Sequence, residues 1–328
     1  MPEVTRRAFL STLPAAVALA SCRRPAPPFV ENDFELPTRS LVGLFDAPDY
    51  GVDFAEVIGR GLTELGVDVT GKSVLVKPNM VEFEPGEAIN THPAVVAGAV
   101  VALRRRGARE VVVGEGPGHR RDVEYLLTAT GLFDRLSDER ITFVDLNHDD
   151  VREVPLRSQF TGLGTLALPV SVLAADLVVS MPKLKAHHWA GMTCGMKNLF
   201  GTVPGAVYGW PKNLLHVRGI DASILDLAAT IRPGLTIVDA VVGMDGDGPI
   251  MGEPHPLGFV AMGTDVVGVD ATCARVVGID PMKLRYLEAA SHFLGNGDAS
   301  RIRQVGEPIE RYRSDFRLID SMRHIRLA

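Results

Sequence analysis

Short apolar runs alternate along the chain with segments whose apolar residues recur at helical spacing. Buried strands are predicted at residues 41–45, 73–77, 110–114, 141–145, 177–180, 235–239 and 302–305. Helices are predicted at residues 54–65, 93–106, 220–231 and 264–277, and another begins near Asp122. Residues 151–170 predict a two-stranded ribbon. The alternation predicts an α/β fold with a mostly parallel sheet and helices on both faces.

Residues 39–310 are expected to form one domain, and the segments on either side of it have a different character. Residues 23–38 contain four prolines and few periodic apolar positions, which is typical of a tether. Residues 311–328 form a charged C-terminal tail. Within the domain, residues 239–256 are rich in glycine, proline and aspartate and are predicted to be a loop.

The first 22 residues have the pattern of an export signal. Arg6 and Arg7 precede a weakly apolar stretch at residues 15–20, as in substrates of the twin-arginine translocase. That stretch is shorter than the roughly 20 apolar residues of a membrane-spanning helix. The residues that end in Cys22 resemble a bacterial lipobox, so Cys22 is a candidate lipidation site; the alternative is an ordinary residue near a signal-peptidase site. We therefore expect an exported protein, lipid-anchored on the periplasmic or extracytoplasmic face of the membrane.

Composition limits the partners and cofactors of the domain. The chain is 46% hydrophobic and 23% charged, as in an ordinary globular protein, and its net charge of -6 argues against nucleic acid as a partner. The sequence has no C-x-x-C motif, so a cysteine-ligated iron-sulfur cluster or a structural zinc of the usual spacing is not expected. The spacing of Cys194 and Cys273 does not decide whether they pair.

Residues 174–205 concentrate the reactive side chains of the chain. They include Lys183, Lys185, His187, His188, Cys194 and Lys197, among four glycines. Most of this segment follows the predicted strand at residues 177–180, and ligand sites in open α/β sheets lie beyond the carboxyl ends of the strands. Because Lys183 and Lys185 are two apart in an extended stretch, their amines are expected to converge on one anion. The alternative is that both are simply solvated.

Two other strand ends carry candidate groups. Lys77 and Asn79 lie at the carboxyl end of the strand at residues 73–77. The glycine-rich turn at residues 115–122 holds His119 and leads into a helix, an arrangement that forms an anion cradle; helix capping or solvation is the alternative for His119. The candidate substrate- or anion-binding residues are therefore Lys77, Asn79, Lys183, Lys185 and Asn198.

From about residue 72 to residue 281 the chain resembles the family called domain of unknown function 362. The segments that carry the resemblance are LVKPNMV, THPAVV, GEGPGH, MPKLKAHHWAGMTCGMKNLFG and GTDVVGVDA. The resemblance names a family without naming a reaction. Some members carry a ferredoxin-like cysteine segment, which this chain lacks, so electron transfer through a cluster is not implied.

The segment that ends near residue 205 is also similar to the central segment of the nickel-pincer lactate racemase family, which implies a lactate-racemase-like fold. By this resemblance Lys197 would hold a pyridinium-derived cofactor covalently, and His187 would be one of two catalytic bases. The Gly-His turn that ends in His119 resembles the turn of the other base, and His216 is the candidate nickel ligand. The resemblance thus implies a nickel-containing or lysine-linked cofactor.

This chain also departs from the racemase pattern. Lys77 and Asn79 stand where that family has an arginine and an aspartate, and Cys194 stands where a small residue is expected. A lactate-like substrate is therefore not implied. The leading hypothesis is an exported, lipid-anchored enzyme that acts on a small polar or anionic substrate by isomerisation or hydride chemistry. The alternative is a non-catalytic protein that holds an anionic ligand or a metal through Lys183, Lys185 and Lys197.

Overall fold

The computed structural model describes residues 27–118 and 122–328. The export signal expected at residues 1–22 and the candidate base His119 therefore lie outside the described residues. The main path of the central sheet consists of β1 (Ser40–Asp46), β2 (Ser73–Pro78), β3 (Glu110–Glu115), β4 (Thr142–Asp145), β7 (Leu177–Met181), β10 (Leu235–Asp247), β11 (Met251–Gly263) and β12 (Ile302–Gly306).

The strand order across this sheet is β12-β1-β11-β10-β7-β2-β3-β4. Neighbouring strands from β10 to β4 run parallel, as do β1 and β12, whereas β11 is antiparallel to both of its neighbours. The expected mostly parallel sheet is thus confirmed. A separate antiparallel ribbon, β5 (Val151–Pro155) with β6 (Thr165–Pro169), forms where the sequence indicated one.

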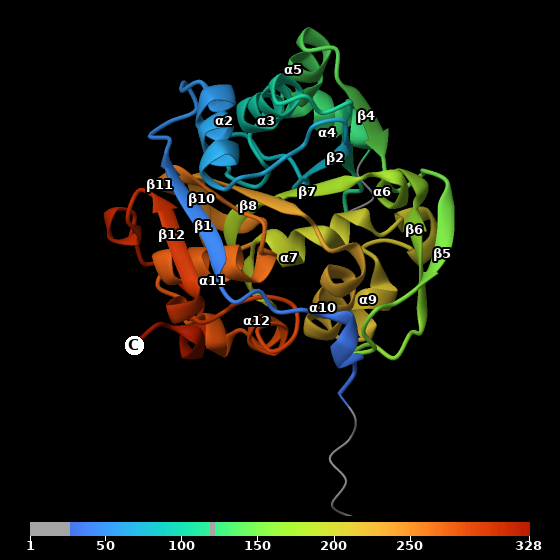
Figure 1. The fold of residues 1–328 in the computed structure, drawn as a ribbon, viewed down its shortest axis with the longest axis vertical. Helices are drawn as coiled ribbons and strands as arrows, with labels where there is room; N and C mark the ends of the chain where they lie inside the picture. Colours follow the sequence, from blue (N-terminus) through green and yellow to red (C-terminus); the bar gives the residue numbers. More distant parts are fainter. Residues whose placement is uncertain (1–26, 119–121) are drawn as a thin grey trace, which may run out of the picture.

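Helices cover both faces of the sheet, as predicted. α2 (Phe54–Glu64) and α3 (Pro93–Arg105) lie on one face, and α7 (Gly195–Asn198), α10 (Ile220–Ile231) and α11 (Val266–Val276) lie on the other (Figure 1). The remaining α-helices of the described chain are α4 (Val123–Ala129), α5 (Leu132–Asp138), α6 (Val170–Ala174), α8 (Gly205–Tyr208), α9 (Asn213–Val217) and α12 (Arg285–Ala290). None of the helices in the described ranges is long and apolar enough to cross a membrane.

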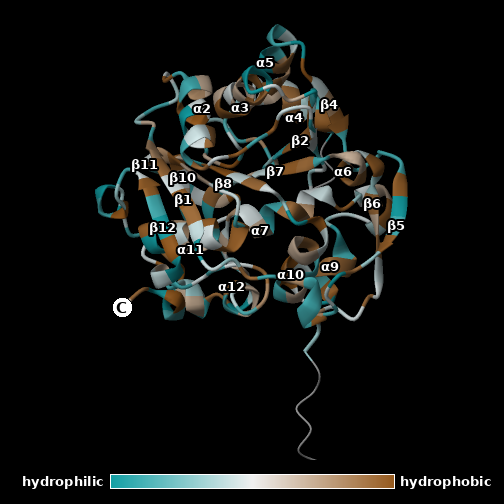
Figure 2. Ribbon diagram, viewed as in Figure 1, coloured by the Kyte–Doolittle hydropathy of each residue, from teal (hydrophilic) through white to brown (hydrophobic). Residues whose placement is uncertain are grey.

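The central strands are apolar on both sides because both faces are covered. On β2, Val74 and Val76 belong to the core beneath α2 and α3, whereas Leu75 between them belongs to a smaller core on the opposite face. Figure 2 shows the hydrophobic colouring along these central strands. A strand with two buried faces therefore reads in the sequence as a continuous apolar run, which is the pattern that located it.

The prediction of a loop at residues 239–256 is wrong. β10 continues to Asp247, and β11 begins at Met251 and pairs with it antiparallel. The glycines that suggested a loop allow close backbone packing instead: a Cβ at Gly248 would overlap the carbonyl oxygen of Ala186, and one at Gly252 would overlap that of Asp245. Glycine in a strand often marks such a close approach.

The reactive segment after β7 is also more regular than predicted. β8 (Lys183–His187) pairs in parallel with β10, and β9 (Gly191–Thr193) folds back antiparallel on β8. Alternate residues of a strand point to the same side, so Lys183, Lys185 and His187 share one face of β8. Their positions are therefore fixed by backbone pairing, in place of the loop that the sequence indicated.

The part of the expected tether that the structure describes, residues 27–38, packs on the domain. Phe29 stacks on Phe293 with ring centres 4.2 Å apart. The backbone N–H of Gln159 donates to the carbonyl oxygen of Pro28 at 2.6 Å. The aromatic contact stabilises this segment against the surface, so it does not act as a free linker.

Residues 311–328 also belong to the folded body. Tyr312, Phe316 and Ile325 are buried in the larger core. The side chain of Arg317 forms an ion pair with Asp245 of β10, with an N–O distance of 2.8 Å. These apolar residues are spaced irregularly among charged ones, which is why the sequence showed only a charged tail.

Candidate active site

A cavity of about 450 Å³ lies at the carboxyl ends of β2, β3 and β8, where ligand sites of such sheets are expected. Its wall is completed by α7, α9 and the turn between β10 and β11. The candidate residues that line it are Lys77, Asn79, Lys185, His187, Lys197, Asn198 and His216. Gly118, the residue before His119, also lines it. Of the described candidates, Lys183 alone is not among the lining residues.

A second cavity, of about 460 Å³, lies beside residues 34–41. Two of its charged groups, Asp265 and Arg232, already have partners. The Asp265 carboxylate accepts from the Ser40 hydroxyl at 2.5 Å and from the Asn296 backbone N–H at 2.7 Å. The Arg232 side chain donates to a backbone carbonyl of the N-terminal segment. Paired groups of this kind hold the segment in place, so the first cavity is the better candidate for chemistry.

Lys77 is held by three acceptors at the floor of the first cavity. Its Nζ atom lies 2.5 Å from Glu115 Oε2, 2.7 Å from the Pro78 carbonyl oxygen and 3.0 Å from Asn198 Oδ1. Burial lowers the pKa of Lys77, although the Glu115 carboxylate opposes that shift. Gly201 packs against this pair, and a Cβ there would overlap Glu115 Oε1. Lys77 thus contributes charge and shape to the cavity, while its donors are already in use.

Lys197 differs from Lys77 because its amine has no polar partner within the part of the chain that the structure describes. No hydrogen bond or ion pair joins Lys197 Nζ to another of the described residues, and the atom lies 3.9 Å from the centre of the Phe200 ring. Desolvation and, secondarily, the charge of Lys77 lower the pKa of Lys197 to about 7. A substantial fraction of this amine is therefore neutral and nucleophilic at neutral pH.

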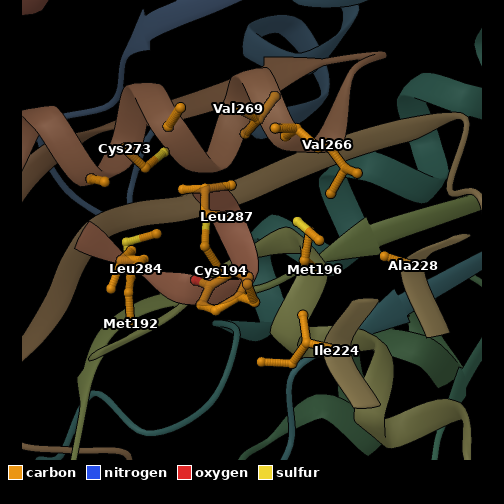
Figure 3. Packing of buried hydrophobic residues seen from close by; sticks show 14 of the residues in the cluster. Met192, Cys194, Met196, Ile224, Ala228, Val266, Val269, Cys273, Leu284 and Leu287 are labelled. Carbon is orange, nitrogen blue, oxygen red and sulfur yellow. The ribbon is translucent and has the colours of Figure 1, made fainter. Parts of the chain in front are cut away.

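The first residues of α7, the helix that carries Lys197, are held by the buried carboxylate of Asp270. Asp270 on α11 accepts hydrogen bonds from the backbone N–H groups of Gly195 at 2.7 Å and Met196 at 3.0 Å. Figure 3 shows Cys194 and Cys273 in the packed region between the two helices, and both thiols are free and buried. Burial raises the pKa of Cys194 well above its ordinary value, so its thiol is inert packing. Asp270 therefore positions Lys197 through the start of α7.

Two more lysines line the cavity, and their amines donate to backbone carbonyl oxygens of described residues. Lys185 Nζ donates to the carbonyls of Ile89 at 2.7 Å and Pro249 at 3.2 Å. Burial and then the charge of Lys183 lower the pKa of Lys185 well below its ordinary value. Lys212 Nζ also donates to two carbonyls, and burial lowers its pKa to about 7. A bound anion would favour the protonated form of these amines.

The hydrogen bonds of His187 identify its tautomer. Its Nδ1 atom accepts from the backbone N–H groups of Trp189 at 3.0 Å and Ala190 at 3.2 Å. An acceptor nitrogen carries no proton, so in the neutral ring the proton is on Nε2. Burial and then the charge of Lys197 lower the pKa of His187 well below 6.5, so the ring is neutral at physiological pH. His187 is thus arranged as a hydrogen-bond donor, whereas the racemase resemblance implied a base.

The mouth of the cavity carries His188, Trp189, His216, Asp247 and Met251. His188 Nδ1 lies 3.3 Å from Asp247 Oδ1. The His216 ring packs edge to face on Trp189, at a centroid distance of 5.7 Å. Within residues 27–118 and 122–328, no group of three or more His, Cys, Asp or Glu side chains could hold a metal ion.

Lys183 lies outside the cavity, so the expected convergence of Lys183 and Lys185 on one anion does not occur. Lys183 Nζ lies 2.6 Å from Asp239 Oδ2 and 2.6 Å from the Tyr50 hydroxyl, and it also donates to the Val242 carbonyl at 3.1 Å. The two lysines share a face of β8, but Lys183 forms an ion pair with Asp239 on the neighbouring strand β10. Lys183 therefore serves as one half of a buried ion pair in this structure.

Asn79 has unused hydrogen-bonding capacity. Its backbone N–H donates to the Thr91 hydroxyl at 2.8 Å, which locks the chain after β2. Its side-chain Oδ1 is buried and has no hydrogen-bond partner among the described residues. A buried polar atom without a partner is costly, so a ligand that donates a hydrogen bond here would be stabilised.

Sequence reasoning missed Glu115 and Lys212. Glu115 ends β3 and is the buried carboxylate of the cavity; the rule that selected Lys77, a polar residue at the carboxyl end of a strand, applies equally to it. Lys212 precedes α9 with a φ of 68°, in the left-handed region that favours glycine. No local pattern marks Lys212, because the carbonyls that hold it come from distant parts of the chain.

The fold and this cavity define an α/β protein with a lysine-rich pocket at the carboxyl edge of a parallel sheet. The family described as Domain of unknown function (DUF362) matches residues 74–275, which is more than half of the chain. The chain is also 30% identical over 241 residues to a thylakoid-associated protein of Synechocystis sp., and the match covers 71% of each chain. The chain therefore belongs to the DUF362 family, which confirms the first resemblance.

Two solved structures align with the chain at low identity. The lactate racemase apoprotein from Thermoanaerobacterium thermosaccharolyticum aligns with a TM-score of 0.45 and 14% identity, over 74% of this chain and 59% of that one. A protein from Thermotoga maritima aligns with a TM-score of 0.37 and 16% identity, over 65% of this chain and 56% of that one. This chain therefore spans less than two thirds of the length of either structure.

Proposed function

We propose that this protein is an enzyme that acts on a small anionic molecule, with Lys197 as its reactive group. The observation that carries the proposal is the state of the Lys197 amine. It lines the cavity, it has no polar partner among the described residues, and its pKa is lowered to about 7. An ordinary lysine, with a pKa near 10.4, is almost fully protonated at neutral pH and does not react in this way.

A carbonyl carbon is the electrophile that suits a neutral lysine. The Lys197 nitrogen forms a bond to this carbon, the carbonyl oxygen leaves as water, and an imine results. The Nε2–H of His187 is suited to donate to the carbonyl oxygen and so to stabilise the charge that develops there. The surrounding lysines attract the anionic part of the substrate.

The residues also fit the lysine-linked, nickel-containing cofactor implied by the racemase resemblance. Lys197 offers the amine for a covalent link, and His216 packs beside Phe200, the ring over which that amine lies. Because the described ranges hold no cluster of three or more metal-ligating side chains, such a cofactor would have to bring most of its own metal ligands. When bound, it would supply a hydride acceptor for isomerisation.

We further propose that the mature protein is exported by the twin-arginine translocase and held at the membrane by a lipid on Cys22. The residues around Arg6, Arg7 and Cys22 support this. The relative from Synechocystis sp. is described as thylakoid-associated, which agrees with a membrane location.

Mass spectrometry and metal analysis of natively expressed protein test the role of Lys197. A mass increment that maps to Lys197 before any treatment identifies a linked cofactor. A reduced adduct that forms only with borohydride and a 2-oxo acid, such as pyruvate or phenylpyruvate, identifies an imine. Lys197→Arg keeps the charge without a nucleophilic amine and should form neither, whereas the exposed Lys283→Arg should behave as wild type.

The same experiment can reject the enzyme. If anionic probes bind, but no preparation carries an adduct or nickel and no oxo acid is trapped, the protein is the non-catalytic anion-binding protein of the alternative hypothesis. The lysines that surround the cavity would then serve binding alone.

A further inference from the structure

Charged and apolar side chains lie at opposite depths of the candidate cavity. Lys77, Lys185 and Asn198 are at most 2% exposed and are held by fixed hydrogen bonds. Trp189 and Met251 line the same cavity but are 62% and 78% exposed. The polar groups therefore form the floor of the cavity, and large apolar side chains form its mouth.

The floor is suited to an anion. The residues that line the cavity include four lysines, Lys77, Lys185, Lys197 and Lys212, but a single buried carboxylate, that of Glu115. That carboxylate is already paired with Lys77. Asp247, the other acidic residue of the wall, lies at the mouth beside His188. An anionic group that enters the cavity thus gains the most favourable interactions at its deep end.

The wall between floor and mouth is suited to an apolar body. Met80, Val81, Phe200, Pro249 and Ile250 line it. The cavity volume of about 450 Å³ lies in the range of pockets that hold drug-sized ligands, and a three-carbon acid would leave most of it empty. Apolar side chains as exposed as Trp189 and Met251 beside a cavity are typical of a surface that a ligand covers.

We infer that the ligand of this site is a free amphiphilic acid, with its anionic head at the lysines and an alkyl or aryl body of roughly six or more carbons along Phe200 and Trp189. This inference rests on the proposed function for the location of the site and adds the class of substrate. It depends on the shape and charge of the cavity, and not on the covalent chemistry of Lys197.

Calorimetric titration with propionate and octanoate tests it, because neither acid has a ketone or aldehyde to react with a lysine. Each methylene that the cavity buries should tighten binding roughly fourfold, so octanoate should bind far more tightly than propionate. Octylamine has the same apolar body with the opposite charge and should not bind. Trp189→Ala and Met251→Ala should each weaken octanoate binding by about tenfold and change propionate binding by less than about twofold.

Phe133→Ala and Met282→Ala are matched controls, because these residues are 54% and 39% exposed and lie outside the cavity. Both variants should bind octanoate as wild type does. Equal affinity for the two acids, or octanoate binding that survives both rim substitutions, would overturn the inference. If octanoate binds but no adduct can be trapped, the inferred class of ligand is supported and the reactive role of Lys197 is rejected. If an adduct is trapped but affinity does not depend on chain length, the reactive role is supported and the inferred class of ligand is rejected.

Discussion

The Nζ atom of Lys197 lies 3.9 Å from the centre of the Phe200 ring, in contact with the ring face. The face of an aromatic ring attracts a cation only weakly, by about 0.5–2 kcal/mol. That attraction does not offset the loss of water around the amine, and the pKa of Lys197 is lowered to about 7. Among the described residues no carboxylate pairs with Lys197, and this is the observation on which its proposed reactivity depends.

We expect Lys197→Met to stabilise the protein at pH 6 and to lose this advantage by pH 10.5. The pKa is about 7 in the folded protein and near 10.5 in the unfolded chain, so the unfolded chain binds the additional proton between these values. The buried Lys197 therefore lowers the free energy of unfolding of the wild type by its full amount below pH 7. This destabilisation decreases as the pH rises toward 10.5. Melting temperatures across this range measure the effect.

Lys283→Met provides the control, because that side chain is exposed and its removal should cause no comparable pH-dependent difference. A Lys197→Met protein that melts well below wild type at every pH would mean that Lys197 is a structural residue.

Lys183, unlike Lys197, forms a buried ion pair, so we expect its removal to destabilise the protein. Lys183→Met leaves the Asp239 carboxylate buried without its cation, which typically destabilises a protein by about 3–5 kcal/mol. Replacing both partners, as in Lys183→Met with Asp239→Leu, should recover a large part of that loss because no uncompensated charge remains. Urea denaturation of the three variants gives the comparison. A single variant as stable as the double one would contradict the buried pair.

Much of the fold follows from local sequence patterns. The helix expected at residues 220–231 forms with those bounds, and Asp122 and Asp265 each accept hydrogen bonds at the start of a helix where one was expected. These features depend on neighbours a few residues away, so periodicity and capping chemistry reveal them. The hairpin of β10 and β11 was missed because Gly243 and Gly248 serve close contacts with β8, which the local sequence does not encode.

The candidate site was predictable in its position and less so in its chemistry. The rule that ligands bind at the carboxyl ends of parallel strands correctly predicted that Lys77, His187 and Lys197 lie close together, and they line one cavity. The rule did not say which lysine is free, because the partner of Lys77 is Glu115 and that of Lys183 is Asp239, both far away in the sequence. Long-range pairing therefore decides which of these amines have a carboxylate partner, and the local sequence does not show it.

The proposed export can be tested through the residues of the predicted signal. Arg6→Lys with Arg7→Lys should leave the protein in the cytoplasm, because the translocase recognises the paired arginines. Cys22→Ser should still be exported but should lose the lipid, and therefore move from the membrane to the soluble periplasmic fraction. Cell fractionation and labelling with a radioactive fatty acid follow both outcomes. Unchanged export of the double-lysine variant would refute the twin-arginine route.

The tautomer of His187 allows the roles of its two ring nitrogens to be tested separately. Asn at this position can keep an acceptor near Nδ1 for the backbone N–H groups of Trp189 and Ala190, but it lacks a donor at the position of Nε2. Gln can place an N–H near Nε2. His187→Asn should therefore fold normally and form the imine at Lys197 about 100-fold more slowly, whereas His187→Gln should retain a rate within about tenfold of wild type.

Two measurements identify the role of His187 independently of these variants. Nitrogen-15 NMR of the imidazole rings should show the proton of His187 on Nε2 and no titration above about pH 6, since burial and the charge of Lys197 lower its pKa well below 6.5. The rate of imine formation should rise with a single midpoint near pH 7, as Lys197 loses its proton. A proton on Nδ1, or a second inflection from His187 near neutral pH, would instead support the catalytic base that the racemase resemblance implies.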